Sequence, residues 1–124
     1  QPDGTGHEIG HDTPEYYQTV EGIDSLVFHI VDTLKKNGMM DDTVIIFSSD
    51  HGGIGKGHGG KTLAEMEIPW IIYGANIPAN GELESSIVTY DTAATIAYIL
   101  GLKTPDFWRG KPIMEAFEVK DKKP

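Results

Sequence analysis

The 124-residue chain contains no cysteine, which excludes disulfide bonds, thiolate metal sites and a cysteine nucleophile. Any metal site must therefore be built from histidine and carboxylate side chains. Basic residues are also scarce, because 10 Lys and Arg stand against 19 Asp and Glu, for a formal net charge of −9. Phosphate backbones are bound mainly by Lys and Arg, so this balance argues against nucleic acid as a partner.

Long hydrophobic runs are missing too. No apolar stretch approaches the roughly 20 residues that span a bilayer, so no membrane partner is expected. No signal-peptide pattern is present, and the localisation cannot be derived from the sequence. The hydrophobic content of 39% is typical of a globular protein of one ordinary domain. If the substrate of so acidic a chain is a phosphate or sulfate ester, bound metal must offset the negative charge.

The first long element predicted is a helix that begins at Asp12-Thr13-Pro14-Glu15. Asp12 or Thr13 can cap it, Pro14 suits the first turn, and Glu15 can complete a capping box with Asp12. Gly38 is the predicted end. Apolar residues recur between these limits at three- and four-residue steps, the pattern of a helix packed on a core: Tyr17, Val20, Ile23, Val27, Ile30, Val31 and Leu34.

Two strands are predicted next. Residues 43–49 form a continuous apolar, largely β-branched run without alternation, which is typical of a central parallel strand with both faces covered. Residues 68–73 form a second buried strand. The glycine-rich residues 52–60 between them must be a loop.

The rest of the chain is predicted to hold one further helix. It opens at Tyr90-Asp91-Thr92 and ends at Gly101. We expect residues 105–117 to be irregular and anchored by Trp108, and residues 120–124 to form a solvated charged tail. Helices interleaved with buried strands predict an α/β layered domain, incomplete because few strands are present. The inner face of the helix is predicted to carry Ala93, Ile96, Ala97 and Leu100.

Five side chains that can bind metal occur in or beside loops. Asp3 and His7 bracket Gly4-Thr5-Gly6, too glycine-rich for a helix start, and a tight loop can turn both toward one ion. Asp50 and His51 follow the first strand at its carboxyl end, where α/β sheets place ligands. His58 lies in the glycine-rich loop beyond. Imidazole with carboxylate suits Zn²⁺, and Mn²⁺ less tightly.

Each of these signals also has a simpler interpretation. An Asp-His pair in a loop is usually a capped turn, and an isolated His58 would be a surface residue. His11 is expected in a solvated loop, with a supporting role beside the metal as the alternative. His29 lies off the apolar stripe of its helix, which indicates a surface residue. The metal hypothesis therefore depends on three segments occurring together in one sequence: Asp3 with His7, Asp50 with His51, and the loop with His58.

Several short motifs follow one another along nearly the whole chain. They are PDGTGHEIG at residues 2–10, SDHGG at 49–53, HGG at 58–60, IPWIIYG at 68–74, YDTAATI at 90–96 and LGL at 100–102. In this order they resemble the alkaline phosphatase superfamily, and more narrowly its type I phosphodiesterase and nucleotide pyrophosphatase branch.

The resemblance implies a partial doubly wound layered α/β sheet, with residues 1–124 as the carboxyl-terminal part of one hydrolase domain. It implies that Asp3, His7 and His58 hold one metal ion and that Asp50 and His51 hold a second. The expected reaction is hydrolysis of a small phosphate ester with two divalent ions, Zn²⁺ or else Mn²⁺. An extracytoplasmic location is in keeping with the resemblance.

The same resemblance places the nucleophile, and another Asp ligand, upstream of this chain in the missing amino-terminal half of the domain. The hydroxyls of Ser48, Ser49, Thr5 and Thr62 do not stand in the family's nucleophile context. We therefore assign no catalytic residue, and we expect the fragment alone to be inactive.

Three alternatives remain open. Residues 55–62 fit a phosphate-loop pattern, but the loop does not leave its strand directly, and Pro69 ends any helix from Thr62 within two turns. A sulfatase of the same superfamily is the closer rival, although such enzymes typically use one calcium ion, for which histidine is a poor ligand. The third is a non-catalytic metal-binding module, which can pair with a second copy through exposed sheet edges.

Overall fold

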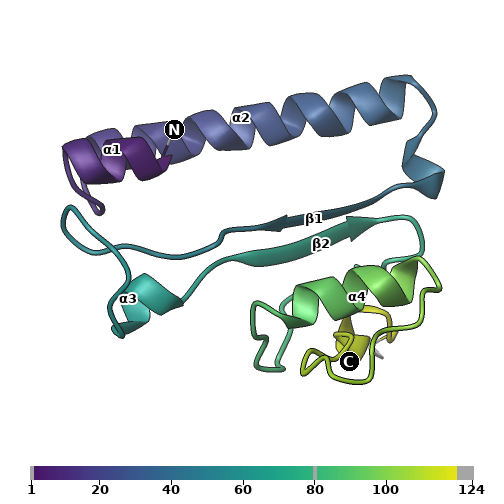
Figure 1. Ribbon diagram of the computed structural model, residues 1–124. Coiled ribbons are helices and arrows are strands. Elements are labelled where there is room, and N and C mark those ends of the chain that lie inside the picture. Colours follow the sequence, from purple (N-terminus) through teal and green to yellow (C-terminus); the bar gives the residue numbers. More distant parts are fainter. Residues whose placement is uncertain (1, 80, 120–124) are drawn as a thin grey trace, which may run out of the picture. The chain divides into compact units, whose positions relative to one another are not determined.

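The computed structural model describes residues 2–79 and 81–119 (Figure 1). The chain divides into two units, Gln1–Ala75 and Asn76–Pro124. The elements are, in order, α1 (Pro2–Glu8), α2 (Pro14–Lys36), the 3-10 turn η1 (Met40–Asp42), β1 (Val44–Ser48), α3 (Leu63–Met66), β2 (Trp70–Gly74), α4 (Asp91–Ile99) and the 3-10 turn η2 (Met114–Ala116).

The long helix α2 begins and ends near the predicted residues. Thr13 caps it, because the Thr13 hydroxyl accepts a hydrogen bond from the Tyr16 N–H at 3.2 Å, and Pro14 follows in the first turn. Asp12 makes a different contact from the one predicted, since its carboxylate accepts a hydrogen bond from the Tyr17 hydroxyl. At the other end Gly38 takes a φ of 65°, which glycine adopts without steric cost.

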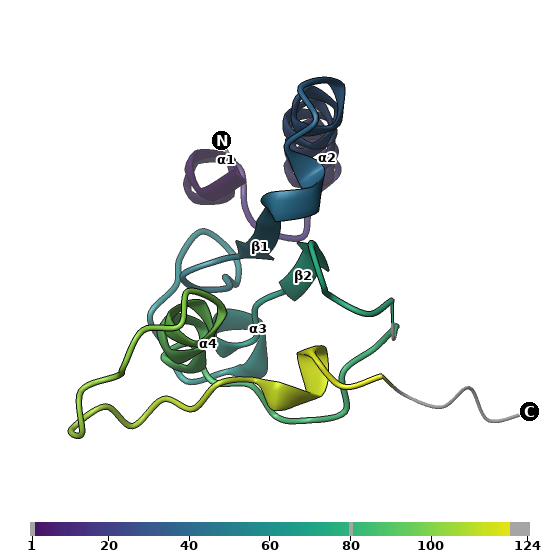
Figure 2. The same ribbon diagram turned by 90° about the vertical axis from the view of Figure 1, so that its right-hand side faces the viewer.

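The apolar stripe of α2 is only partly covered. Ile23, Val27 and Val31 are half-buried, whereas Tyr17 and Ile30 are 52% and 58% exposed. The short helix α1 packs against α2, and both views show the two helices side by side (Figures 1 and 2). None of the helices in the described ranges combines the length and the apolar character that crossing a bilayer requires.

The strands β1 and β2 confirm the two predicted strands, but their pairing is antiparallel, with Val44 opposite Gly74 and Ser48 opposite Trp70. The prediction of a central parallel strand is therefore wrong for the described sheet, which has two strands. A continuous apolar run is common in buried parallel strands, but it does not by itself fix the direction of the neighbouring strand. The doubly wound layering is not confirmed either, because Ile71 and Tyr73 of β2 are more than half exposed.

The second unit contains the buried apolar side chains of the described residues. Ala94, Thr95 and Ala97 are the buried residues of α4, whereas Ile96 and Leu100 are 43% and 63% exposed. Of the four residues predicted for the inner face, Ala97 is therefore confirmed, whereas Ala93, Ile96 and Leu100 are exposed. The covered face of α4 consists of small residues, and Ile113 and Ala116, 7% and 2% exposed, are the other buried apolar residues described in this unit. The Ile113 N–H donates to the Thr95 hydroxyl at 3.0 Å.

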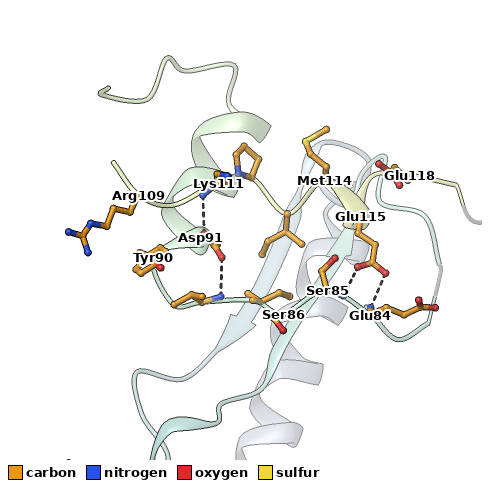
Figure 3. Close-up of a pocket in the computed structure, with 14 residues that line it drawn as sticks. Glu84, Ser85, Ser86, Tyr90, Asp91, Arg109, Lys111, Met114, Glu115 and Glu118 are labelled. Atoms are coloured by element: carbon orange, nitrogen blue, oxygen red, sulfur yellow. Dashed lines mark hydrogen bonds between the residues drawn. The ribbon is translucent and has the colours of Figure 1, made fainter. Parts of the chain in front are cut away.

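Two carboxylates hold the loops of this unit, as Figure 3 shows. Asp91 accepts hydrogen bonds from the Val88 and Lys111 N–H groups at 3.0 and 2.9 Å. Glu115 accepts from the N–H groups of Glu84 and Ser85, both at 2.9 Å. These contacts line an open cavity of 820 Å³.

Two further predictions concern the end of the chain. Gly101 ends α4 with a φ of 65°, as predicted. Trp108 is 41% exposed, so the predicted anchor is instead supplied by Ile113 and Ala116. The predicted tail at residues 120–124 lies outside the described residues.

Candidate metal centre

The first unit brings three of the predicted ligands to one point. One ligand atom each from Asp3, His7 and His58 lies within 4.8 Å of the other two, and all three residues are exposed. Asp3 and His7 are four residues apart on α1, and the His7 Nε2 lies 3.5 Å from the Asp3 Oδ1. Helical i, i+4 spacing thus places both side chains on one face. The prediction that this segment is a loop is wrong.

The helix α1 forms despite two glycines, each of which costs roughly 1 kcal/mol in a helix relative to alanine. Tertiary contacts offset this cost. The Thr5 hydroxyl lies 3.2 Å from the Thr19 hydroxyl of α2, a hydrogen bond between the two helices. Gly6 is the buried residue of α1, and an added Cβ there would lie 2.4 Å from the His11 ring. Gly6 is therefore required by close packing.

The other two predicted ligands join the same cluster. Asp50 and His51 follow the end of β1, and the His51 Nε2 lies 3.6 Å from Asp50 Oδ2 and 4.0 Å from Asp3 Oδ1. The His51 ring stacks on the His58 ring, with centroids 3.8 Å apart. The turn after the strand thus directs Asp50 and His51 to one side, as expected.

Backbone carbonyls select the tautomers of two of these histidines. The His7 Nδ1 lies 3.0 Å from the Lys56 carbonyl oxygen, and the His51 Nδ1 lies 2.8 Å from the Gly52 carbonyl oxygen. A carbonyl oxygen can only accept, so each Nδ1 must carry the proton. Each Nε2 then has a free lone pair, the form of imidazole that binds a metal ion.

Hydrogen bonds also favour the ionised form of nearby carboxylates. Backbone N–H donation, followed by the charge of the neighbouring His51, lowers the pKa of Asp50. The Thr62 hydroxyl, followed by the Gly60 N–H, lowers the pKa of Glu65. Glu65 accepts hydrogen bonds from these two groups at 2.6 and 2.8 Å, and it thereby holds the loop that carries His58.

The donor set fits a borderline transition metal. Three imidazoles and two carboxylates suit Zn²⁺ or Mn²⁺ better than calcium, which prefers oxygen ligands. Five donors are too few for two closed four-coordinate sites, so the cluster leaves coordination positions for water, substrate or additional ligands.

The hydroxyls considered as nucleophiles all make local hydrogen bonds. Ser49 donates to the His51 carbonyl at 2.9 Å, Thr62 donates to Glu65, and Thr5 pairs with Thr19. Ser48 is 3.4 Å from the Ser49 carbonyl. These contacts give each hydroxyl a local structural role.

The phosphate-loop alternative is wrong. The segment after residue 62 forms only the four-residue helix α3, which begins with a capping box between Thr62 and Glu65. A phosphate loop requires a substantial helix whose N-terminus faces the phosphates. Pro69 limits the helix, as the sequence predicts.

His11 lies in a different environment from the one that the sequence predicts. The expectation is a solvated loop, but the His11 ring is partly buried between Gly6 and Gly53. The sequence signal that could have located it is these two glycines, since a side chain at either position would require the His11 ring to shift.

The fold and the site together define a class of protein: an α/β chain with an open histidine and carboxylate cluster beyond the end of a strand. Residues 1–102 match the sulfatase family model, so the chain belongs to the sulfatase family, within the alkaline phosphatase superfamily. No solved structure matches the chain significantly.

Curated relatives include both sulfatases and phosphodiesterases. The chain is 29% identical to the extracellular sulfatase SULF-1 homolog of Drosophila melanogaster, over 78% of this chain and 9% of that protein. It is 26% identical to arylsulfatase K of Bos taurus, over 89% of this chain and 21% of that protein. It is 30% identical to ectonucleotide pyrophosphatase/phosphodiesterase family member 7 of Homo sapiens, over 68% of this chain and 21% of that protein. The chain spans less than a quarter of each relative, and the phosphodiesterase branch is not specifically confirmed.

Proposed function

We propose that this chain supplies metal ligands to the catalytic centre of a metal-dependent hydrolase of sulfate or phosphate esters. In this proposal residues 1–124 are the carboxyl-terminal part of one alkaline phosphatase-like domain. The observation that carries it is the approach of Asp3, His7 and His58 to within 4.8 Å, from segments far apart in the sequence.

The proposed roles follow from the side chains themselves. Asp3, His7 and His58 would hold one divalent ion, and Asp50 with His51 the other. Divalent ions at such a site supply positive charge that polarises the ester and stabilises the oxygens that attack and leave. The carbonyls that bind Nδ1 of His7 and His51 keep each Nε2 available. The ionised Asp50 contributes negative charge that favours cation binding.

Sulfate esters are the first substrate class to test. The sequence motifs favour phosphate esters, but the family match and two of the relatives named above support the sulfatase alternative at least as well. Phosphate diesters are the second class. They are favoured by the histidine-rich donor set and by the relative named as a pyrophosphatase/phosphodiesterase.

The proposed nucleophile and the remaining metal ligands come from another part of the same domain. The support is that the five clustered donors fall short of two closed sites, and that the chain spans less than a quarter of its relatives. We expect no turnover from residues 1–124 alone. Two relatives are named as extracellular sulfatases or their homologues, which supports an extracytoplasmic location for the whole protein.

Metal uptake by the 124-residue chain tests the site directly. Equilibrium dialysis against Zn²⁺, Mn²⁺ or Ca²⁺, with elemental analysis of the bound ion, should show uptake of Zn²⁺ or Mn²⁺ in preference to Ca²⁺. The change His58→Ala should abolish most of this uptake. His29→Ala is the matched control, because His29 is exposed on α2. Absence of stoichiometric binding, or equal uptake by the His58→Ala chain, would contradict the proposal.

Activity of the full-length protein tests the substrate class. Hydrolysis of nitrophenyl sulfate and of bis-nitrophenyl phosphate should be compared in the wild type and in the Asp50→Asn variant. Faster hydrolysis of the sulfate, lost in the variant, supports the first class, and faster hydrolysis of the diester supports the second. If neither ester is cleaved while the metal is bound, the chain is a non-catalytic metal-binding module.

A further inference from the structure

The imidazole of His11 lies between the two segments that carry most of the clustered side chains. Its Nδ1 is 3.0 Å from the Gly55 carbonyl oxygen, and its backbone N–H donates to the same oxygen at 2.7 Å. His11 thus attaches the chain just after α1 to the glycine-rich loop by two hydrogen bonds to one acceptor. Since the carbonyl only accepts, Nδ1 must be the protonated ring nitrogen.

Two glycines enclose the ring. A Cβ added at Gly6 of α1 would lie 2.4 Å from the His11 Nε2, and one added at Gly53 of the loop would lie 2.3 Å from it. The three atoms nearest to each added Cβ all belong to the His11 ring. The ring therefore fills the space between α1 and the loop, and its Nε2 faces backbone. His11 is accordingly a poor candidate for a metal ligand.

His11 and His7 act on adjacent residues of the same turn. His11 binds the carbonyl of Gly55, and His7 binds the carbonyl of Lys56. The turn itself is closed by hydrogen bonds between Ile54 and Gly57, directly before His58. A displacement of the turn would therefore move His58 relative to α1.

We propose that His11 is a positioning residue that fixes the separation of α1 from the glycine-rich loop, and so brings His58 into range of Asp3 and His7. This inference rests on the metal centre proposed above. Burial does not hold the ligands in place, because Asp3, His7 and His58 are all exposed. Without His11 the same ligands remain but no longer converge, so the affinity for the ion falls.

The first test compares His11→Ala with His11→Asn in the 124-residue chain. Zn²⁺ affinity should be measured by competition with a chromophoric chelator, and the ligand geometry by the visible absorption of bound Co²⁺. Removing an outer-shell partner of a metal site typically weakens binding 10- to 100-fold, and we expect about this loss for His11→Ala. The Asn side chain places an N–H donor close to the position of Nδ1, so His11→Asn should recover at least half of the lost binding free energy.

The second test uses the enclosing glycine. Gly53→Ala should displace the ring and weaken Zn²⁺ binding about as much as His11→Ala does. In the double variant His11→Ala/Gly53→Ala the methyl group added at residue 53 has room. The Zn²⁺ affinity of the double variant should therefore equal that of His11→Ala alone. Such non-additivity is expected only if both changes act through the same contact. Additive losses would overturn the proposal.

The controls separate failure of this inference from failure of the metal site. If the wild-type chain binds no Zn²⁺, the proposed metal centre is wrong and His11 positions nothing. If the wild type binds Zn²⁺ and His11→Ala binds within about twofold of it, the metal centre stands and the role of His11 is overturned. Should far-ultraviolet circular dichroism show that His11→Ala is unfolded, His11→Asn decides. Binding by the folded His11→Asn chain within about tenfold of the wild type supports the proposal, and a larger loss overturns it.

Discussion

The two units of the chain are stabilised in different ways. The second unit, residues 76–124, contains the buried apolar side chains of the described residues, Ala94, Ala97, Ile113 and Ala116. The first unit carries the histidine and carboxylate cluster, and its contacts are hydrogen bonds, close glycine packing and stacked imidazoles. Burial of apolar side chains stabilises the second unit, whereas the first unit carries histidine and carboxylate side chains that a bound cation would hold together.

This difference predicts which of the two units a bound metal ion should stabilise. Metal binding contributes to the free energy of folding when the ligands converge in the folded chain and not in the unfolded one. The exposed cluster of the first unit meets this condition. The buried face of α4 does not, and we therefore expect the two units to respond differently to metal.

The largest expected effect is the loss of metal affinity on changing a shared ligand. Asp3 lies near both His7 and His51, so Asp3→Asn removes a charge that faces two imidazoles. We expect Zn²⁺ affinity to fall by about 100-fold or more, beyond the effect of an outer-shell change. Calorimetric titration provides the measurement. Asp41→Asn, at an exposed position of η1, is the matched control and should bind as the wild type does.

Metal should also protect the amides of the first unit from hydrogen exchange. At a free ion concentration about 100 times the dissociation constant, binding stabilises the bound form by about 2.7 kcal/mol. The Gly52 and Gly53 amides, which bond to α3 at 2.9 and 2.8 Å, should show roughly this gain. The Leu100 amide at the end of α4 is the internal reference. Equal gains in both units would refute the contrast between them.

A smaller effect is expected in the second unit from Thr95→Val. The Thr95 hydroxyl is completely buried, donates to the Asp91 carbonyl at 2.8 Å and accepts from the Ile113 N–H. The change leaves the buried Ile113 N–H without its acceptor, which should cost about 1–3 kcal/mol of unfolding free energy. Hydrogen exchange of the α4 amides measures this cost. The exposed Thr89→Val is the control, and unchanged Zn²⁺ affinity in both variants would show that the units are independent.

The smallest expected effect is a pH dependence of the loop that carries His58. The pKa of Glu65 is lowered from 4.5 in the folded chain, so the stability that its carboxylate gives to this loop is fully present above the unfolded pKa. This contribution is lost as the pH falls through the lower, folded pKa. The Gly60 amide resonance should therefore shift in acid as the Glu65 carboxylate is protonated. In Glu65→Gln this step should disappear, and its persistence would assign it to another group.

Local sequence signals predict most of the elements and the identity of the cluster. Thr13 and Pro14 define the start of α2, Gly101 defines the end of α4, and the β-branched run defines β1, because these depend on near-neighbour sterics and capping. The five candidate ligands stand out by their chemistry and by their places at strand ends and loops. Their convergence is seen in the structure, and their role as ligands remains a prediction.

Other features could not be predicted from local signals. The glycine content of α1 indicates a loop, yet residues 2–8 are helical, and the absence of a side chain at Gly6 leaves room for the His11 ring. The apolar stripe of α4 indicates Ile96 and Leu100 beside Ala97 on the inner face, yet the buried residues are Ala94, Thr95 and Ala97. Each error arises because packing in the folded chain, and not the local residue pattern, decides which positions are covered.

The donor types, the excess of negative charge and the limits of the main helices and strands can thus be derived from the sequence. These properties depend on side-chain chemistry and on neighbours within a few residues. Three features are seen first in the folded chain: the antiparallel pairing of β1 with β2, the helical presentation of Asp3 and His7, and the enclosed place of His11. These features depend on contacts between different segments of the chain, and such contacts leave no periodic signal in either partner.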